Sequence, residues 1–438
     1  MHWFLLAGSI EALLFQLRLI GDLRKSLLEA IYLQIALGTL YLFAVFAASH
    51  AGPSNKRRVL LILAAALLFR WTVAPLPPAL SDDVFRYRWE GAVQAAGGNP
   101  YFTRPADPGW SHLKDETYDR IPGVDFRAVY GPLTELVQHA TYAATRHLAA
   151  DPLEQATWFK APAAIFDLLA IAGGLLVLHV YGLSLERIVI YAWCPLPLIE
   201  FWGTGHNDAL AVAALFFGLA FAKRGLPAAA MAALGIAGAA KLWPLALIPL
   251  FGRIVGWRHC WIPLAVFAGL ALPYWPSDYQ EVIQNLRFAS GFVGGWRNND
   301  SLFGGILWMA GGNFYIAKRI AFGLAGSLLA VLTLRRVALH RAVLIFVAGL
   351  LALSANCHSW YLTWMLPSLL IEPYLPILLW TVLSPFAYVA VFRWYSAGEW
   401  IGIQTTRWYI YLPVYGCILA DAIVKGCSLK QRLLTKPR

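Results

Sequence analysis

The sequence predicts an all-α protein, a polytopic bundle of about 11–13 transmembrane helices forming a single domain over residues 1–438. Three observations predict this fold class. Of the residues, 59% are hydrophobic and 13% are charged, about half the charged share of a soluble domain. Apolar stretches of the length that a membrane span needs recur along the chain. Lys and Arg gather in short clusters between these stretches, as in cytoplasmic loops.

The same composition excludes several classes of function. The net charge is +11, but no basic stripe interleaved with aromatic residues follows a helix face, so we expect no nucleic-acid partner. The five cysteines lack a CxxC or other metal-ligand spacing, which argues against a disulfide framework and a zinc site. We predict no cofactor. An acidic pair described below is compatible with a divalent ion, which we do not favour.

The spans and their orientation follow from the apolar stretches and the basic loops. The predicted spans are 28–49, 58–76, 160–180, 188–202, 207–222, 259–274, 318–334, 341–355, 359–372, 374–393 and 408–424. Two weaker amphipathic segments, 2–20 and 132–148, either span within the bundle or lie along the interface. The basic loops predicted to be cytoplasmic are 56–58, 223–224, 253–259, 335–341 and 425–438. The loops predicted outside, with short juxtamembrane helices, are 77–131, 203–207, 275–316, 356–359 and 394–407.

Two regions do not fit a simple alternation of loops. Residues 132–202 must cross an even number of times, so we favour a juxtamembrane helix at 132–148 over an outside turn at 181–187. Residues 226–252 have basic loops at both ends. A helix that breaks near Lys241 and Pro244 and then returns resolves this, because each arm keeps about 12–15 residues. Lys241 then lies at the outer tip of a broken pair, where irregular backbone lines a cavity.

The strongest chemical signal is the run from Ser81 to Gly91, which contains Asp82, Asp83 and Arg86. Adjacent carboxylates at the mouth of a membrane cavity are costly unless they are solvated, paired or bound to a cation. An ionised carboxylate there suits a general base that takes a proton from a sugar hydroxyl. The alternative is that Ser81 or Asp82 simply caps a helix.

Other polar residues gather in the predicted outer loops. Asn99, Tyr101 and Tyr130 stand beside turn signals, so each either shapes the first outer loop or contacts substrate. His206, Asn207 and Asp208 begin a new span, where they either cap it or bind an anion or a sugar hydroxyl.

Three candidates suit the binding of a phosphate group. Lys241 lies in an uncharged apolar stretch and requires an anionic partner, for which we favour a phosphate over a structural carboxylate. Arg297 and Asn298 follow an aromatic-rich loop and suit recognition of phosphate or sugar, with an interfacial belt and a helix cap as the alternative. His358 either neutralises a phosphate or satisfies backbone groups at a turn.

Together these motifs resemble those of the GT-C glycosyltransferases. An Asp-Asp pair in the first large outer loop is followed by Asn99-Pro100-Tyr101, Tyr130-x-Pro132-Leu133, Gly205-His206-Asn207-Asp208 and Lys241-x-x-Pro244. The order looks most like glycosyltransferase family 87, the polyprenyl-phosphate-mannose-dependent mannosyltransferases of bacteria, over residues 58–372. The chain departs from that pattern at Gly131, where the family more often has proline.

The resemblance implies an acidic catalytic residue in the first outer loop and inversion at the anomeric carbon. It places the base on Asp82 or Asp83, with Asp82 favoured as the first acid of the pair. It also places Lys241 and His358 near the donor phosphate, and Asn207 and Asp208 near the cavity.

We therefore expect a hexosyltransferase that moves a hexose from a polyprenyl-phosphate donor to a lipid-linked or glycan acceptor. Mannose is the expected sugar. Membrane lipid surrounds it, and the expected location is the bacterial inner (cytoplasmic) membrane with the active site facing outward. The main alternative is a polytopic transporter or lipid flippase, which also uses broken helices and intramembrane charge. A non-catalytic lipid-binding scaffold would explain neither the acidic pair nor Lys241.

Overall fold

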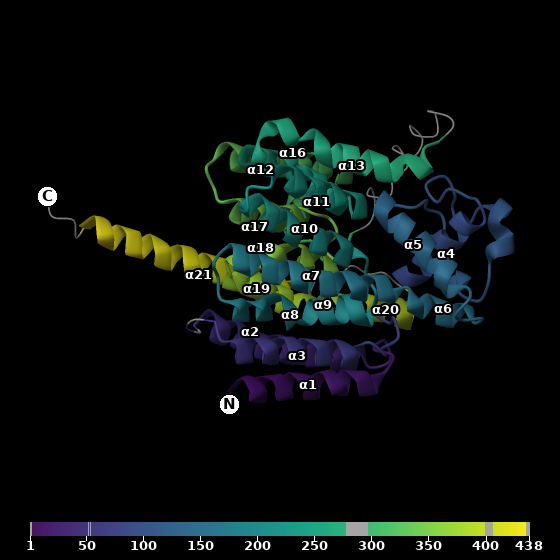
Figure 1. Ribbon diagram of the computed structural model, residues 1–438, viewed down its shortest axis with the longest axis horizontal. Coiled ribbons are helices and arrows are strands. Elements are labelled where there is room, and N and C mark those ends of the chain that lie inside the picture. The colour runs from purple at the N-terminus through teal and green to yellow at the C-terminus, as the bar shows by residue number, and fades with distance from the viewer. Residues whose placement is uncertain (1, 51, 53, 277–296, 399–405, 435–438) are drawn as a thin grey trace.

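The computed structural model describes residues 2–50, 52, 54–276, 297–398 and 406–434, so residues 277–296 of the second predicted outer loop (275–316) lie outside the described residues. Within the described chain, helices joined by turns make up the fold, and an isolated bridge links Asn298 to Asn356. The long helices lie side by side in an elongated bundle (Figure 1). The predicted fold class is confirmed. The stretches long and apolar enough to cross a membrane are Trp3–Ile20, Leu27–Ser49, Pro152–Val180, Phe314–Leu334 and Leu375–Arg393.

The first three helices form one side of the bundle. They are α1 (His2–Ile20), α2 (Leu27–Ser49) and α3 (Lys56–Val73). Asn55 begins α3 by accepting the Arg57 backbone N–H at 2.9 Å. The weak segment at 2–20 packs against both α2 and α3 and runs alongside the long helices at one edge of the bundle (Figure 1).

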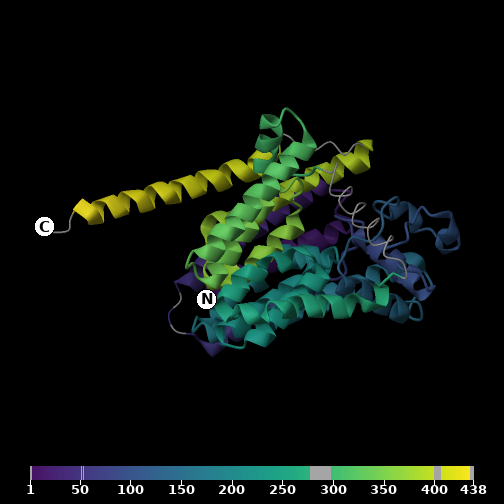
Figure 2. The same cartoon turned by 90° about the horizontal axis from the view of Figure 1, so that it is seen from above.

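A cap of short helices covers one end of the bundle. It consists of α4 (Asp83–Ala95), two 3₁₀ turns (Pro108–Leu113 and Tyr118–Arg120), α5 (Pro132–Thr145) and α6 (Pro152–Trp158). Figures 1 and 2 show this cap beyond the ends of the long helices. Pro132 and Pro152 occupy first-turn positions, where a missing N–H costs nothing. The prediction of a juxtamembrane helix near 132–148 agrees with this placement of α5.

The chain then crosses the bundle twice. It leaves the cap along α7 (Lys160–Val180) and returns through Leu185–Ile188, α8 (Val189–Ala192), α9 (Pro195–Pro197) and the π-helical turn Leu198–Gly203. The turn between them is tied to the end of the bundle remote from the cap, because Glu186 accepts the Asn55 N–H at 2.6 Å. Residues 132–202 therefore cross an even number of times, as predicted.

The broken pair at Lys241 is also confirmed. After α10 (Asp208–Lys223), the Ala-rich α11 (Pro227–Ala240) ends where Lys241 adopts an extended conformation, with φ −141° and ψ 140°. The 3₁₀ turn Trp243–Leu247 and α12 (Ile248–Val255) lead back. Pro244 cannot donate the backbone bond that would continue α11, so the helix stops here.

The remaining helices complete the bundle. They are η6 (Trp257–His259), α13 (Trp261–Ala271), η7 (Leu272–Tyr274), α15 (Leu302–Met309), α16 (Phe314–Leu334), α17 (Leu339–Ala352), η8 (Ser359–Met365), α18 (Leu366–Ile371), α19 (Leu375–Leu383), η9 (Ser384–Tyr388), α20 (Val389–Ala397) and α21 (Arg407–Leu434). Figures 1 and 2 show α21 running on past the bundle at the end opposite the cap.

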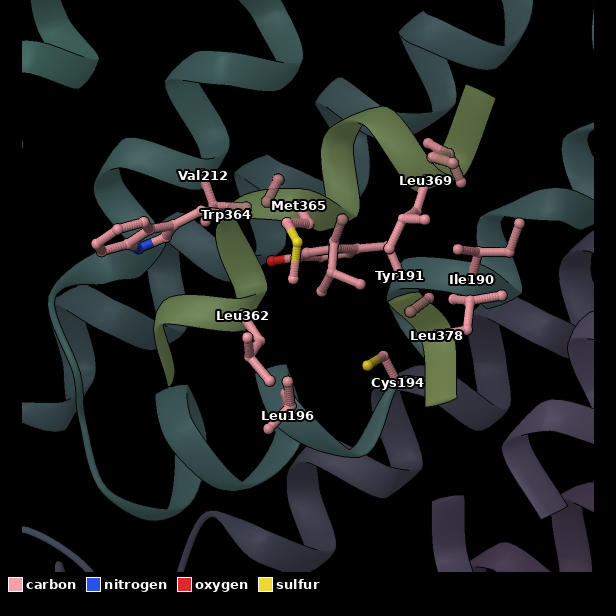
Figure 3. Close-up of a cluster of buried hydrophobic side chains, with 14 of the residues drawn as sticks. Ile190, Tyr191, Cys194, Leu196, Val212, Leu362, Trp364, Met365, Leu369 and Leu378 are labelled. Carbon is pink, nitrogen blue, oxygen red and sulfur yellow. The ribbon is translucent and has the colours of Figure 1, made fainter. Parts of the chain in front are cut away.

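The interior is mostly apolar, and its buried charges are paired. Side chains from α8, α10, η8, α18 and α19 pack around Tyr191 and Met365 (Figure 3). Arg70 and Asp167 are both fully buried and form an ion pair at 2.6 Å, which Tyr191 extends by donating to Asp167 at 2.8 Å. Full pairing is what a charge within the bundle requires.

Candidate active site

Asp82 sits at the junction between the bundle and α4, under the cap. Its Oδ1 lies 2.5 Å from Arg120 Nη2 and 3.9 Å from Arg24 Nη1. Its side chain makes no capping bond to α4, whereas the Ser81 hydroxyl accepts the Asp83 N–H at 3.2 Å. The capping alternative thus fits Ser81, and Asp82 is held by guanidinium groups.

Asp83 has different neighbours, although it is adjacent in sequence. Its Oδ2 accepts the Tyr87 hydroxyl at 3.4 Å and lies 3.8 Å from Nε2 of the buried His206. Its side chain keeps 24% of its surface exposed. Successive helical residues point about 100° apart, and this separates the two carboxylates. Asp83 is therefore the acid that combines access with a place inside the polar cluster.

Four other predicted site residues build the loop that carries the acids. Arg86 is buried and is occupied by Glu90 at 2.6 Å and by the carbonyls of Gly123 (2.9 Å) and Phe126 (2.7 Å). These bonds fold the loop back onto α4.

The tyrosines form a second layer of the loop. Asn99 donates to the Tyr274 carbonyl at 2.9 Å, and the Tyr101 hydroxyl donates to the Tyr130 carbonyl at 2.8 Å. Tyr130 meets the ring of Tyr87 edge to face, with centroids 5.2 Å apart. Tyr130 thus contacts Tyr87, which in turn contacts Asp83. Asn99 and Tyr101 fix the loop behind Tyr87.

The turn before α10 brings three predicted residues into the bundle. Gly205 has φ +85°, and a Cβ there would approach Lys160 Cγ to 2.9 Å, so a side chain fits poorly in conformation and in space. The His206 N–H donates to the Glu200 carbonyl at 2.8 Å, which locks the turn onto the π-helical segment Leu198–Gly203. Such π turns occur frequently at functional sites.

Asp208 and Lys241 form a buried ion pair, with Nζ and Oδ2 2.5 Å apart. The Trp364 indole N–H donates to the other oxygen of Asp208 at 2.6 Å. The Lys241 ammonium also lies 4.9 Å from the centroid of the Tyr361 ring. The anionic partner that Lys241 requires is thus present in the chain, while 17% of its side chain stays exposed to a ligand.

Asn207 differs from its neighbour. It is 8% exposed, and within the described chain neither its side-chain oxygen nor its nitrogen has a hydrogen-bond partner. It does not cap α10 through its side chain. A buried unsatisfied amide is costly and calls for an explanation.

His358 lies on the loop between α17 and η8 and is held by Asn298, whose amide nitrogen is 3.0 Å from Nδ1. Asn298 reaches it because the backbone bridge places residues 298 and 356 side by side. Burial lowers the pKa of His358 to about 3, with His206 and Lys241 adding to the effect. The imidazole is therefore neutral at physiological pH and offers a hydrogen bond, not a charge.

Arg297 binds a neighbouring carboxylate. Its guanidinium group donates two hydrogen bonds to Asp300, of 2.8 and 2.9 Å, and Arg407 forms an ion pair with the same carboxylate at 3.2 Å. Two guanidinium groups thus share one buried acid next to Asn298.

A small apolar pocket, with a cavity volume of about 20 Å³, lies between α4, α5, α7 and α10. Tyr87 and Asn207 line it at the side of the acids. Its other lining residues are Thr134, Val137, Gln138, Thr141, Phe159, Pro162, Ala163, Gly205 and Leu210. The unsatisfied amide of Asn207 therefore lines an apolar cavity beside Asp83.

Sequence reasoning missed several residues that complete the site. Glu200 carries a fully buried carboxylate 3.1 Å from His206 Nδ1. Trp360 stacks between His206 (3.8 Å) and His358 (4.4 Å). Glu200 sits in an apolar run and Trp360 among aromatic residues typical of an interface, so nothing in the linear pattern distinguished them.

Asp83, Asp208 and Lys241 belong to one polar cluster. Tyr87 contacts Asp83 and lies within electrostatic range of Asp208. Tyr361 lies beside Lys241 and within electrostatic range of Asp83 and Asp208. Within the described chain, no group of three or more His, Cys, Asp or Glu residues is arranged to hold a metal ion. The site thus offers a partly exposed carboxylate, an ammonium paired with Asp208, hydrogen-bond donors and a small apolar pocket.

Comparison with known proteins gives one match. Residues 10–257 match the model of the MptA_B family, described as alpha-(1->6)-mannopyranosyltransferase, N-terminal domain. No curated protein and no solved structure matches the chain. The matched residues exceed half of the chain and include both acids, the turn before α10 and Lys241. The chain therefore belongs to this GT-C type family and is a membrane mannosyltransferase.

Proposed function

We propose that this protein transfers mannose, with inversion, from a polyprenyl-phosphate-linked donor to a hydroxyl group of a glycan or lipid-linked acceptor. The observation that carries the proposal is the placement of Asp83. It is a partly exposed acid in a cluster that contains an ammonium group, and its hydrogen-bond partner Tyr87 lines a small apolar pocket.

Asp83, and not Asp82, acts as the general base in this proposal. A carboxylate that takes a proton must have an accessible oxygen within reach of the acceptor hydroxyl. Asp82 is engaged by Arg120, whose Nη2 lies 2.5 Å from Oδ1, so this oxygen is occupied within the chain and is not presented to the acceptor hydroxyl. The preference for Asp82 that follows from family resemblance is thus reversed.

The reaction is a single displacement. The acceptor oxygen forms a bond to C1 of mannose, and the bond from C1 to the phosphate oxygen breaks with its electron pair going to the phosphate. The acceptor proton moves to the Asp83 carboxylate. Because inversion gives the α linkage named for the family, the donor carries mannose in the β configuration.

Positive charge and hydrogen-bond donors stabilise the departing phosphate. Lys241 supplies the charge, since its ammonium group remains partly exposed beside Asp208. His358 supplies a hydrogen bond without a charge. Arg297 directly precedes Asn298, whose side-chain amide is hydrogen-bonded to His358. No metal or other cofactor is needed in this scheme.

A lipid-linked donor suits the surroundings of the site. The pocket between α4, α5, α7 and α10 is lined mainly by apolar side chains, which favour a hydrocarbon chain over a nucleotide. Asn207 offers an unsatisfied amide at its edge to the polar end of such a lipid. The basic loops lie at the other end of the bundle, so the positive-inside rule places the site outside the cytoplasm. We infer a bacterial inner membrane location.

Transfer assays with matched donors test this proposal. Purified protein in lipid nanodiscs is given polyprenyl-phosphate β-mannose, the α anomer, or a nucleotide-diphosphate mannose, together with an α-mannoside acceptor. The expected result is an α-mannosidic product with the first donor alone. Equal product from the nucleotide donor would overturn the lipid-donor assignment. Movement of the lipid between leaflets without transfer would favour the flippase alternative.

A further inference from the structure

His206 lies between two carboxylates from distant parts of the chain. Its Nδ1 is 3.1 Å from Oε2 of Glu200, and its Nε2 is 3.8 Å from Oδ2 of Asp83. The side chain of His206 is 1% exposed and that of Glu200 is fully buried. Within the described chain, neither ring nitrogen makes a hydrogen bond of good geometry. The ring therefore faces an acid on each side with both nitrogens available.

The ring is placed to orient both acids. A carboxylate only accepts hydrogen bonds, and an imidazole nitrogen that carries a hydrogen donates one. Trp360 stacks on the ring at 3.8 Å and an interplanar angle of 18°.

Glu200 is fixed independently of Asp83. The Tyr388 hydroxyl donates to its second carboxylate oxygen, and the backbone N–H of His206 donates to its carbonyl. Asp83 is the movable and exposed end of the array, with 24% of its side chain accessible. The other ionisable groups around His206 are His358 beyond Trp360, the Asp208–Lys241 pair, and Lys160, whose side chain would crowd any side chain at the adjacent Gly205.

We propose that His206, held between Glu200 and the Trp360 ring, is a positioning residue that keeps the Asp83 carboxylate aimed at the acceptor hydroxyl. This inference rests on the proposed function, because it assigns His206 a role through the proposed base. His206 keeps its own proton throughout. Only the acceptor proton moves, and its destination is Asp83.

The positioning role has a definite kinetic consequence. Removal of the imidazole leaves the Asp83 carboxylate without the neighbour that orients it, so proton transfer in the transition state is impaired. Because the donor binds through other groups, kcat falls while the KM for the donor changes little.

The test uses two variants that fail in different ways. His206→Gln removes the ring, while His206→Phe removes the ring nitrogens and retains a ring that stacks on Trp360. His147→Gln, on an exposed histidine after α5, is the control. We expect both His206 variants to lower kcat about tenfold or more with the KM for the donor little changed. The control should match wild type.

The outcomes separate the two proposals. A wild-type kcat in His206→Phe would show that the ring serves packing alone and would overturn this inference while leaving mannose transfer standing. If His206→Gln does not fold, the Phe variant decides. Wild-type protein without mannosyl transfer from any lipid-linked donor would overturn the proposed function itself.

Discussion

Asp208 and Lys241 show how this bundle keeps opposite charges in its interior. The pair is 2.5 Å apart, and Trp364 satisfies the second carboxylate oxygen. Such a pair adds little net stability, but removal of one partner leaves a charge that is buried and unpaired.

We predict that Lys241→Met and Asp208→Asn each destabilise the protein by about 3–5 kcal/mol. The double variant should lose less than the sum, because neither charge is then left alone. Thermal unfolding in detergent measures this coupling. Strictly additive losses would show that the two side chains do not interact.

Glu135 lies outside the membrane-spanning segments, and its burial changes its pKa. It is fully buried on α5, and Gln94 bonds to its carboxyl group at 3.3 Å. Burial, reinforced by the charge of Glu90, raises the pKa of Glu135 well above its usual range. Because the folded-state pKa is raised, the stability that the protonated Glu135 contributes is present at low pH and is lost as pH rises through that value.

Glu135→Gln should therefore make stability less dependent on pH above the usual range of a glutamic acid. Unfolding temperatures of wild type and variant across a pH series provide the measurement. A wild-type protein that becomes more stable over that range would contradict the assigned direction.

At the scale of elements, the loop that carries the acids is docked on the tip of α11. The Gly131 N–H donates to the Ala240 carbonyl at 3.2 Å, and the Thr134 hydroxyl donates to the same oxygen at 2.9 Å. A Cβ at Gly131 would lie 2.1 Å from the Ala239 carbonyl oxygen. This contact explains the departure from the family pattern here, since proline has no N–H to donate.

Gly131→Ala should force the loop away from α11, and we expect a cost of about 1–3 kcal/mol together with most of the activity. Gly109→Ala is the matched control, because that glycine lies on the same loop with nothing within 4 Å of the added carbon. Unfolding temperature and transfer rate are compared for both. Equal effects would show that the docking contact is unimportant.

Much of the element order was predictable, and the reasons are local. The hydrophobic spans, the even crossing of 132–202 and the break after α11 all follow from apolar length, basic loops and Pro244. The two carboxylates of the acidic pair could not be told apart, because their partners Arg120 and His206 come from other elements. Glu200 was missed for the same reason, since its significance lies in its contact with His206.

At the scale of the whole molecule, polar chemistry and basic loops occupy opposite ends. The Arg253 guanidinium donates to the carbonyls of Arg335 and Val337, and Glu186 pairs with Arg58 at 3.3 Å, all remote from the cap. The cap, the acids and the broken pair share the other end.

This separation predicts which residues a membrane-impermeant thiol reagent reaches in intact cells. In a background without native cysteines, Gly109→Cys in the cap should be labelled, and Lys56→Cys at the start of α3 should be labelled only after the membrane is opened. The reverse pattern would place the site in the cytoplasm.

The most direct test of the account is the rate of mannosyl transfer at saturating polyprenyl-phosphate mannose for Asp83→Asn beside Asp82→Asn. We predict that Asp83→Asn lowers kcat by about 10²–10⁴-fold, the usual contribution of a general base, with the unfolding temperature little changed. Asp82→Asn should retain a larger share of the rate and lose stability with its Arg120 contact. A folded Asp83→Asn variant that transfers mannose at the wild-type rate would contradict the account.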